Sequence, residues 1–289
     1  MPVSAGQSSV VAAATNKASA SQPGTYTRTA IAVFFALTFC WSWGIGYAAS
    51  QIGSRSAAWA AALLMASSFG PSIAALAVVA FFSGRAGLRD WLARCLNHRV
   101  GWRWFALAFL APPVVMLAAL AIHVGLGGEM EALLPADKVP LAIVNFGLVL
   151  LVGGPLGEEF GWRGYAMPAL MARIDWRTAS LVIGVVWGLW HLPLFFMAGT
   201  AQSQMPIPVF LLNILAGAML FGWLFVRSQS SVLPALIAHM SLNSWAGLLH
   251  IVPTAATGRP YAIVTALLSA IAIVVLVMPE RRGGKAVAL

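Results

Sequence analysis

Long runs of apolar residues, separated by short polar or basic segments, dominate the chain from about residue 30 onward. A helix that crosses a bilayer needs about 20 predominantly apolar residues. The pattern predicts eight such helices: Ala30–Ser50, Ala57–Phe82, Trp104–Leu126, Pro140 to about Met167, Thr178–Ala198, Pro206–Val226, Ser231–Leu249 and Tyr261–Met278. The expected fold class is therefore all-α, a polytopic bundle of about eight transmembrane helices.

Composition agrees with this pattern, because 60% of the residues are hydrophobic and only 9% are charged. Soluble globular domains carry about 25% charged residues. The formal net charge of +9 would suggest a nucleic-acid partner in a soluble domain. Here the basic residues lie between apolar spans, where cytoplasmic loops and anionic lipid account for them. We therefore expect membrane lipid as a partner and no nucleic acid.

The distribution of basic residues predicts the orientation. With both termini in the cytoplasm, only Arg55, Lys138 and Arg259 of the 17 Lys and Arg residues fall on the outer side. Cytoplasmic loops of membrane proteins carry an excess of Lys and Arg, which supports this orientation. Arg outnumbers Lys in this alanine-rich chain, as is typical of GC-rich bacterial genomes. We expect a bacterial inner-membrane protein with cytoplasmic termini.

An amphipathic segment follows the second expected span. Its apolar residues recur at helical spacing: Leu88, Trp91, Leu92, Cys95 and Leu96. Its arginines fall mostly on other faces: Arg85, Arg89, Arg94 and Arg99. This pattern is typical of a helix that lies at the membrane surface, and it favours a lipid anchor over a substrate-binding role.

Two adjacent carboxylates, Glu158 and Glu159, stand inside an apolar run. Ionisable groups within a membrane cost about 3 kcal/mol or more, so they are functional candidates by default. On a helix Glu159 can pair with Arg163 four residues later, whereas Glu158 is rotated by about 100°. We expect a structural Glu159–Arg163 pair and a Glu158 side chain that faces a cavity. A purely structural ion pair is the alternative.

Other polar groups lie in later apolar helices. His191 stands well inside the fifth expected span, just before Pro193, while His239 and Asn243 are four residues apart on one helix face of the seventh. A single intramembrane histidine is often only packed, and buried Glu and His also build proton relays in transporters. Carboxylate, imidazole and amide together are nevertheless the parts of a hydrolase.

These residues form three motifs that resemble those of the CAAX-protease and bacteriocin-processing (Abi or CPBP) family of intramembrane proteases. Glu158, Glu159 and Arg163 match Glu-Glu-x-x-x-Arg. Trp187 and His191 match a motif with an aromatic residue, usually Phe, four places before a His. His239 and Asn243 match His-x-x-x-Asn. Each motif alone is weak, but all three occur in order on successive apolar segments.

The resemblance implies an endopeptidase that hydrolyses a peptide bond of a membrane-associated or lipidated, CAAX-like substrate. In this family pattern Glu158 is the base, His191 assists the water, and His239 with Asn243 stabilises the oxyanion. Glu159, Arg163 and Trp187 have supporting roles. The corresponding organisation is an unstructured tail (1–27), N-terminal helices with the basic loop (28–139), a protease core (140–250), and a last helix with a basic tail (251–289).

The same motifs allow a zinc site, in which Glu158, His191, His239 and a water molecule would be the ligands. Zinc-bound histidines usually donate their second nitrogen to a carboxylate or carbonyl. Because we expect Glu159 to be engaged by Arg163, and Asn243 already has a role as oxyanion donor, the sequence favours direct activation of water. Zinc is the alternative cofactor.

Two other classes of function compete with hydrolysis. A non-catalytic member of the family would act as a membrane scaffold or immunity-type binding protein, and replacement of Glu158 and His191 would then leave its phenotype unchanged. A proton-coupled transporter would use the buried Glu and His as a relay and would move a solute across vesicles.

Overall fold

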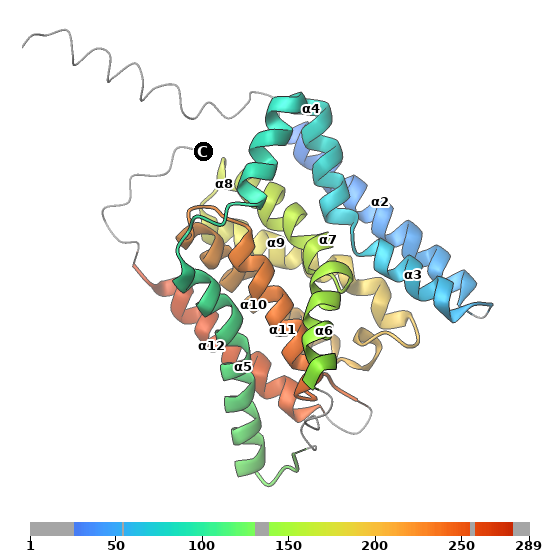
Figure 1. Ribbon diagram of the computed structural model, residues 1–289, viewed down its shortest axis with the longest axis vertical. Coiled ribbons are helices and arrows are strands. Elements are labelled where there is room, and N and C mark those ends of the chain that lie inside the picture. Colours follow the sequence, from blue (N-terminus) through green and yellow to red (C-terminus); the bar gives the residue numbers. More distant parts are fainter. Residues whose placement is uncertain (1–25, 54, 131–138, 255–257, 280–289) are drawn as a thin grey trace, which may run out of the picture.

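The computed structural model describes residues 26–53, 55–130, 139–254 and 258–279, and all its regular elements within these ranges are helical (Figure 1). The expected unstructured tail, 1–27, thus lies almost wholly outside the described residues. The all-α prediction is confirmed.

The helices follow one another along the chain with only short connections. Their bounds are α2 Arg28–Ile52, α3 Ala57–Ser67, α4 Gly70–Cys95, α5 Trp102–Gly125, α6 Val139–Val152, α7 Pro155–Gly161, the π-helix η2 Trp162–Ala166, α8 Met167–Met171, α9 Trp176–His191, the 3-10 helices η3 Leu192–Phe196 and η4 Gln202–Gln204, α10 Ile207–Arg227, α11 Leu233–Leu248, and α12 Arg259–Val277.

Seven helices of the described chain, rather than the eight expected, are long and apolar enough to cross a membrane. One of the seven runs through α6, α7, η2 and α8 as Val139–Met171. The expected span Ser231–Leu249 instead forms α11, which has 16 residues. A turn with positive φ at Gln229 and Ser230 precedes α11, and another at His250 follows it, so the helix cannot extend beyond the apolar run at either end.

The second expected span, Ala57–Phe82, is also wrong as a single helix. The chain breaks after α3, and α4 starts at Gly70 with Pro71 in its first turn. Proline lacks the N–H that would continue the hydrogen bonding of a preceding helix, so it stands at a helix start. Gly70 also permits close packing, because a Cβ there would lie 2.0 Å from the Ser42 hydroxyl oxygen of α2.

The helix expected over 140–167 is interrupted just before the paired carboxylates. Gly154 has φ of 109°, in a region that favours glycine, and Pro155 then opens α7. Glu158 therefore lies in the first turn of α7. The interruption separates the short helix that carries both glutamates from the long apolar helix α6.

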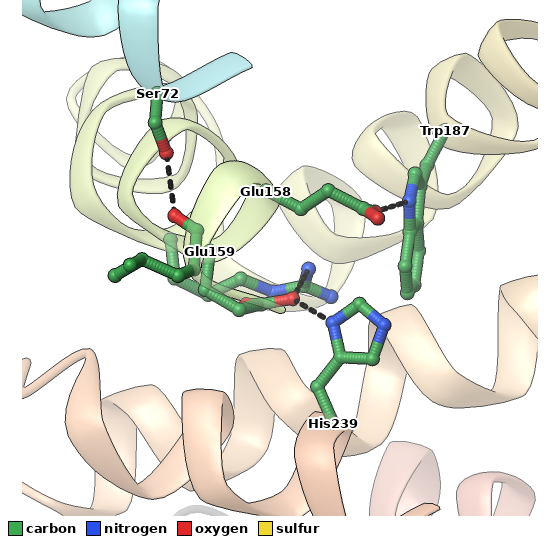
Figure 2. A network of polar contacts seen from close by, with 7 residues as sticks. Ser72, Glu158, Glu159, Trp187 and His239 are labelled. Carbon is green, nitrogen blue, oxygen red and sulfur yellow. Dashed lines mark hydrogen bonds and ion pairs between the residues drawn. The ribbon is translucent and has the colours of Figure 1, made fainter. Parts of the chain in front are cut away.

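Two glycines bring α7 against the turn between α3 and α4. A Cβ at Gly157 would lie 2.6 Å from the carbonyl oxygen of Ser68, and one at Gly161 would lie 2.4 Å from Pro71. In the same contact the Ser72 hydroxyl donates to the carbonyl of Leu156 (2.9 Å; Figure 2). These close approaches fix the helix that carries Glu158 and Glu159.

The amphipathic segment forms the second part of α4, after a kink at Gly84 (φ 60°, ψ −155°). In Figure 1 the chain turns back at this kink. The apolar residues of the segment do not share one environment: Trp91 and Cys95 are buried against the protein, whereas Leu92 and Leu96 are exposed. Only part of the predicted apolar face is therefore available to lipid.

Candidate active site

Glu158 and Glu159 point in different directions from α7 (Figure 2). Both are buried, with 4% and 0% of their surface exposed. Glu158 extends towards Trp187 of α9, and Glu159 extends towards His239 of α11. The helical offset read from the sequence thus sends the two carboxylates to different partners.

Trp187 donates a hydrogen bond from its indole nitrogen to Oε2 of Glu158, with an N···O distance of 2.5 Å. The same ring contacts three other residues of the site. Its centroid lies 5.4 Å from that of the His239 ring and 5.8 Å from that of His191, and the Arg163 guanidinium lies 5.0 Å from it. Trp187 is therefore at the centre of the polar cluster.

The expected pair of Glu159 and Arg163 is confirmed, with 3.0 Å between Nη1 and Oε1. The guanidinium also lies 5.0 Å from the centroid of the Phe221 ring. However, Oε1 of Glu159 is in addition 2.9 Å from Nδ1 of His239. The premise that Arg163 alone engages Glu159 was wrong, because a carboxylate oxygen has two lone pairs and can accept from both groups.

The two histidines are oriented by bonds to their Nδ1 atoms. His191, with 8% of its surface exposed, has Nδ1 at 2.8 Å from the carbonyl oxygen of Trp187 one turn earlier. A carbonyl can only accept, so Nδ1 of His191 is the donor, and Nε2 of the neutral ring carries the lone pair. At His239 the carboxylate of Glu159 likewise makes Nδ1 a donor.

A cavity of about 550 Å³ joins these side chains. Its lining includes Glu158, Trp187, His191, His239 and Asn243, together with apolar residues such as Met116 and Phe210. The structure therefore brings the four predicted catalytic residues to one cavity, although they come from α7, α9 and α11. The volume is typical of sites that hold a small ligand or a short segment of chain.

Gly154 belongs to this site and was missed in the sequence. A Cβ on Gly154 would lie 2.5 Å from Oε1 of Glu158, and the positive φ of the residue disfavours a side chain in any case. Only glycine leaves room for the Glu158 carboxylate here. The signal in the sequence was the pair Gly153-Gly154 before Pro155, which interrupts an otherwise apolar run.

Among the described residues, no three His, Cys, Asp or Glu side chains are grouped closely enough to hold a metal ion. The second nitrogens of His191 and His239 do have the carbonyl and carboxylate partners that zinc ligands commonly use. The donor set of Glu158, His191 and His239 is thus chemically suitable but is not assembled as a ligand set.

Comparison with known proteins identifies the segment that holds this site. Residues 140–245 match the family described as Rce1-like, type II CAAX prenyl endopeptidase. CAAX prenyl protease 2 of Methanococcus maripaludis is 28% identical over 169 residues, which cover 54% of this chain and 60% of that protein. Glu158, Trp187, His191, His239 and Asn243 all lie within the segment that matches the family.

The chain therefore spans less than two thirds of the length of the curated relative that it matches. The resemblance stated from the three motifs is nevertheless confirmed, because the matched segment contains all of them. Through this core, the chain is similar to the Rce1-like family of type II CAAX prenyl endopeptidases, a family of hydrolases.

Proposed function

We propose that this protein is an intramembrane endopeptidase that hydrolyses a peptide bond with a water molecule activated by Glu158 and His191. One observation carries the proposal: a carboxylate, two imidazoles and an amide from three different helices line one largely apolar cavity. Burying such polar groups within a membrane costs free energy. Their meeting at one cavity is explained if they take part in a single reaction.

Water activation falls to two groups that can accept a proton. Trp187 holds one oxygen of Glu158, and the other oxygen accepts the proton of the attacking water. His191 directs its Nδ1–H to a backbone carbonyl, so its Nε2 lone pair accepts a hydrogen bond from the same water. The water thereby gains nucleophilic character and is oriented for attack.

The oxyanion that forms on the substrate carbonyl needs donors that are already in place. Asn243 provides an amide N–H₂, and it lies one helical turn after His239 on the same face. His239 uses Nδ1 to bind Glu159, so its Nε2 carries a hydrogen only when the ring is doubly protonated. We infer that His239 acts as an imidazolium, stabilised by the negative charge of Glu159.

This assignment balances the charges of the buried site. Glu158 and Glu159 contribute two negative charges, and Arg163 and protonated His239 contribute two positive charges. Attack of water forms a C–O bond and places the proton on Glu158. Collapse of the tetrahedral intermediate breaks the C–N bond, and Glu158 returns the proton to the departing amine nitrogen. The products are a carboxylic acid and an amine, and transfer of the acid's proton to the amine leaves a carboxylate and an ammonium group.

The substrate class follows from the cavity and from the family. The cavity combines the polar groups with apolar side chains from several helices, which suits a peptide presented from the membrane. The matched family and relative are described as CAAX prenyl endopeptidases or proteases. We propose a membrane-associated or lipidated, CAAX-like peptide as substrate, with the bacterial inner membrane as the location.

A comparison of membranes that contain wild-type or Glu158→Gln protein tests this function. Mass spectrometry of released peptides should find products that appear only with the wild-type protein and end at a consistent position relative to the cleaved bond. Identical peptide profiles for the two proteins would contradict the proposal and favour a non-catalytic role. Solute uptake into vesicles by the purified protein, without any peptide cleavage, would favour a transporter.

A further inference from the structure

The outward face of the second part of α4 carries arginines and leucines in one strip. Arg85, Arg89, Leu92 and Leu96 are separated by four, three and four residues, so they share a helix face. All four are exposed. They line a surface groove of about 780 Å³, together with His98 and Arg99 from the loop that follows.

The groove is positive and has no acidic side chain in its lining. Asp90, the acidic residue of this segment, is not part of that lining. In the part of the chain that the structure describes, no carboxylate pairs with Arg85, Arg89 or Arg99. An anionic group is thus the complementary ligand.

The residues around the groove indicate that it lies at the membrane surface. Trp102 follows the loop and has 80% of its surface exposed, as is common for tryptophans at the boundary between lipid and water. Leu92 and Leu96 are 37% and 55% exposed beside the arginines. Exposed leucines next to exposed arginines match a molecule with an anionic headgroup and an acyl chain, rather than a soluble anion.

We propose that this groove binds the headgroup phosphate of an anionic phospholipid, with an acyl chain against Leu92 and Leu96. The arginines at 85, 89 and 99 would bind the phosphate by charge-assisted hydrogen bonds. Basic helices at membrane surfaces attract anionic lipid with about 1 kcal/mol for each basic residue. The site is separate from the candidate active site and does not depend on the proposed peptidase activity.

The inner side of the same segment holds the helix of the paired carboxylates. Trp91 donates from its indole nitrogen to the carbonyl of Phe160 (3.2 Å), and Arg94 donates to the carbonyl of Gly164 (3.5 Å). Gly164 permits this contact, because a Cβ there would lie 2.8 Å from the Cys95 sulfur. A lipid bound to the outer face would therefore contact a segment whose inner face packs against α7 and η2.

The segment also contacts the start of α11, which carries His239 and Asn243. The Ser231 hydroxyl donates to the carbonyl of Asn97 (2.6 Å), and the backbone N–H of Val232 lies 3.5 Å from the carbonyl oxygen of Arg94. One basic segment thus contacts two of the three helical regions that supply the site, those of Glu158 and of His239 with Asn243. Lipid bound to its outer face should stabilise the folded protein.

Native mass spectrometry of the purified full chain tests this proposal with phosphatidylglycerol and phosphatidylcholine at equal concentrations. The wild-type protein should retain phosphatidylglycerol in preference to phosphatidylcholine. Arg85→Gln/Arg89→Gln should reduce this retention by about 25-fold, since each basic residue contributes a factor of about 5. Arg28→Gln/Arg55→Gln, which removes the same charge from exposed sites elsewhere, should retain phosphatidylglycerol like the wild type.

Equal losses in both double variants would overturn the proposal, because they would reflect net charge rather than a site. Unchanged retention in Arg85→Gln/Arg89→Gln would also overturn it. Glycerol 3-phosphate should not displace the lipid, and displacement would mean that the groove binds soluble phosphates. As a second readout, phosphatidylglycerol should raise the Tm of the wild type by about 3 °C or more and leave that of Arg85→Gln/Arg89→Gln unchanged.

Discussion

The indole nitrogen of Trp187 lies 2.5 Å from Oε2 of Glu158, so an aromatic residue of one motif donates a hydrogen bond to the carboxylate of another. A phenylalanine, the usual residue of this motif, has no such donor. The tryptophan is therefore more than an aromatic replacement. In this protein it fixes one oxygen of the carboxylate that we propose as the base.

Trp187→Phe tests this contribution, because it keeps an aromatic ring and removes the N–H. Hydrogen bonds to charged groups contribute about 1.5–3 kcal/mol, so kcat should fall about 10-fold or more while KM stays unchanged. Trp190→Phe is a matched control, since the buried indole nitrogen of Trp190 has no partner among the described residues. A Trp187→Phe enzyme with wild-type kcat would contradict the role of this hydrogen bond.

Gly154→Ala should impair the site through Glu158. A methyl group at this position would lie 2.5 Å from Oε1 of Glu158, and the φ of 109° is unfavourable for alanine. We expect turnover to fall about 100-fold, because a displaced base no longer reaches the water. Gly147→Ala is the control, since a Cβ there meets no atom within 4 Å. Equal activity of both variants would show that Glu158 does not need this space.

Arg163→Ala should destabilise the protein, because Glu159 and Arg163 are both fully buried. Breaking a buried ion pair from one side leaves an uncompensated charge and costs about 3–5 kcal/mol. The yield of monodisperse protein and its Tm should both fall. Arg55→Ala, at an exposed position, should leave both unchanged. If Arg163→Ala had the Tm of the wild type, the pair would have no structural role.

Removal of metal distinguishes the two chemistries that the motifs allow. Protein that has been stripped by a strong chelator and shown by elemental analysis to be metal-free should keep its peptidase activity. Added zinc should not increase that activity. Loss of activity on stripping, with recovery at about one equivalent of zinc, would instead make Glu158, His191 and His239 metal ligands.

The sequence predicted contacts that depend on local geometry. The Glu159–Arg163 pair follows from a spacing of four residues, and the different direction of Glu158 follows from the helical rotation between neighbours. The contacts of Trp187 with Glu158 and of His239 with Glu159 join residues 29 and 80 positions apart. Such contacts depend on how helices pack, which the spacing within one helix does not determine.

The number of spans was overestimated for a similar reason. Hydropathy records the apolar character of a segment and not its backbone path, so it did not show that Ser231, Val232 and Leu249 lie outside α11, which has only 16 residues. The same limitation concealed the breaks at Gly70 and Gly154, where glycine and proline change the direction of an apolar chain. The break at Gly70 forms the turn between α3 and α4, and the break at Gly154 starts α7, the short helix that carries Glu158.

The most direct test of the account is the rate of peptide cleavage by purified protein in liposomes, with Glu158→Gln compared to the wild type. The substrate would be a peptide whose cleavage by the wild-type protein has first been verified by mass spectrometry. Because a general base contributes about 10²–10⁴-fold, Glu158→Gln should lower kcat about 1,000-fold. Its elution profile and Tm should remain those of folded protein. Near-normal cleavage by Glu158→Gln would contradict the assignment of Glu158 as the base.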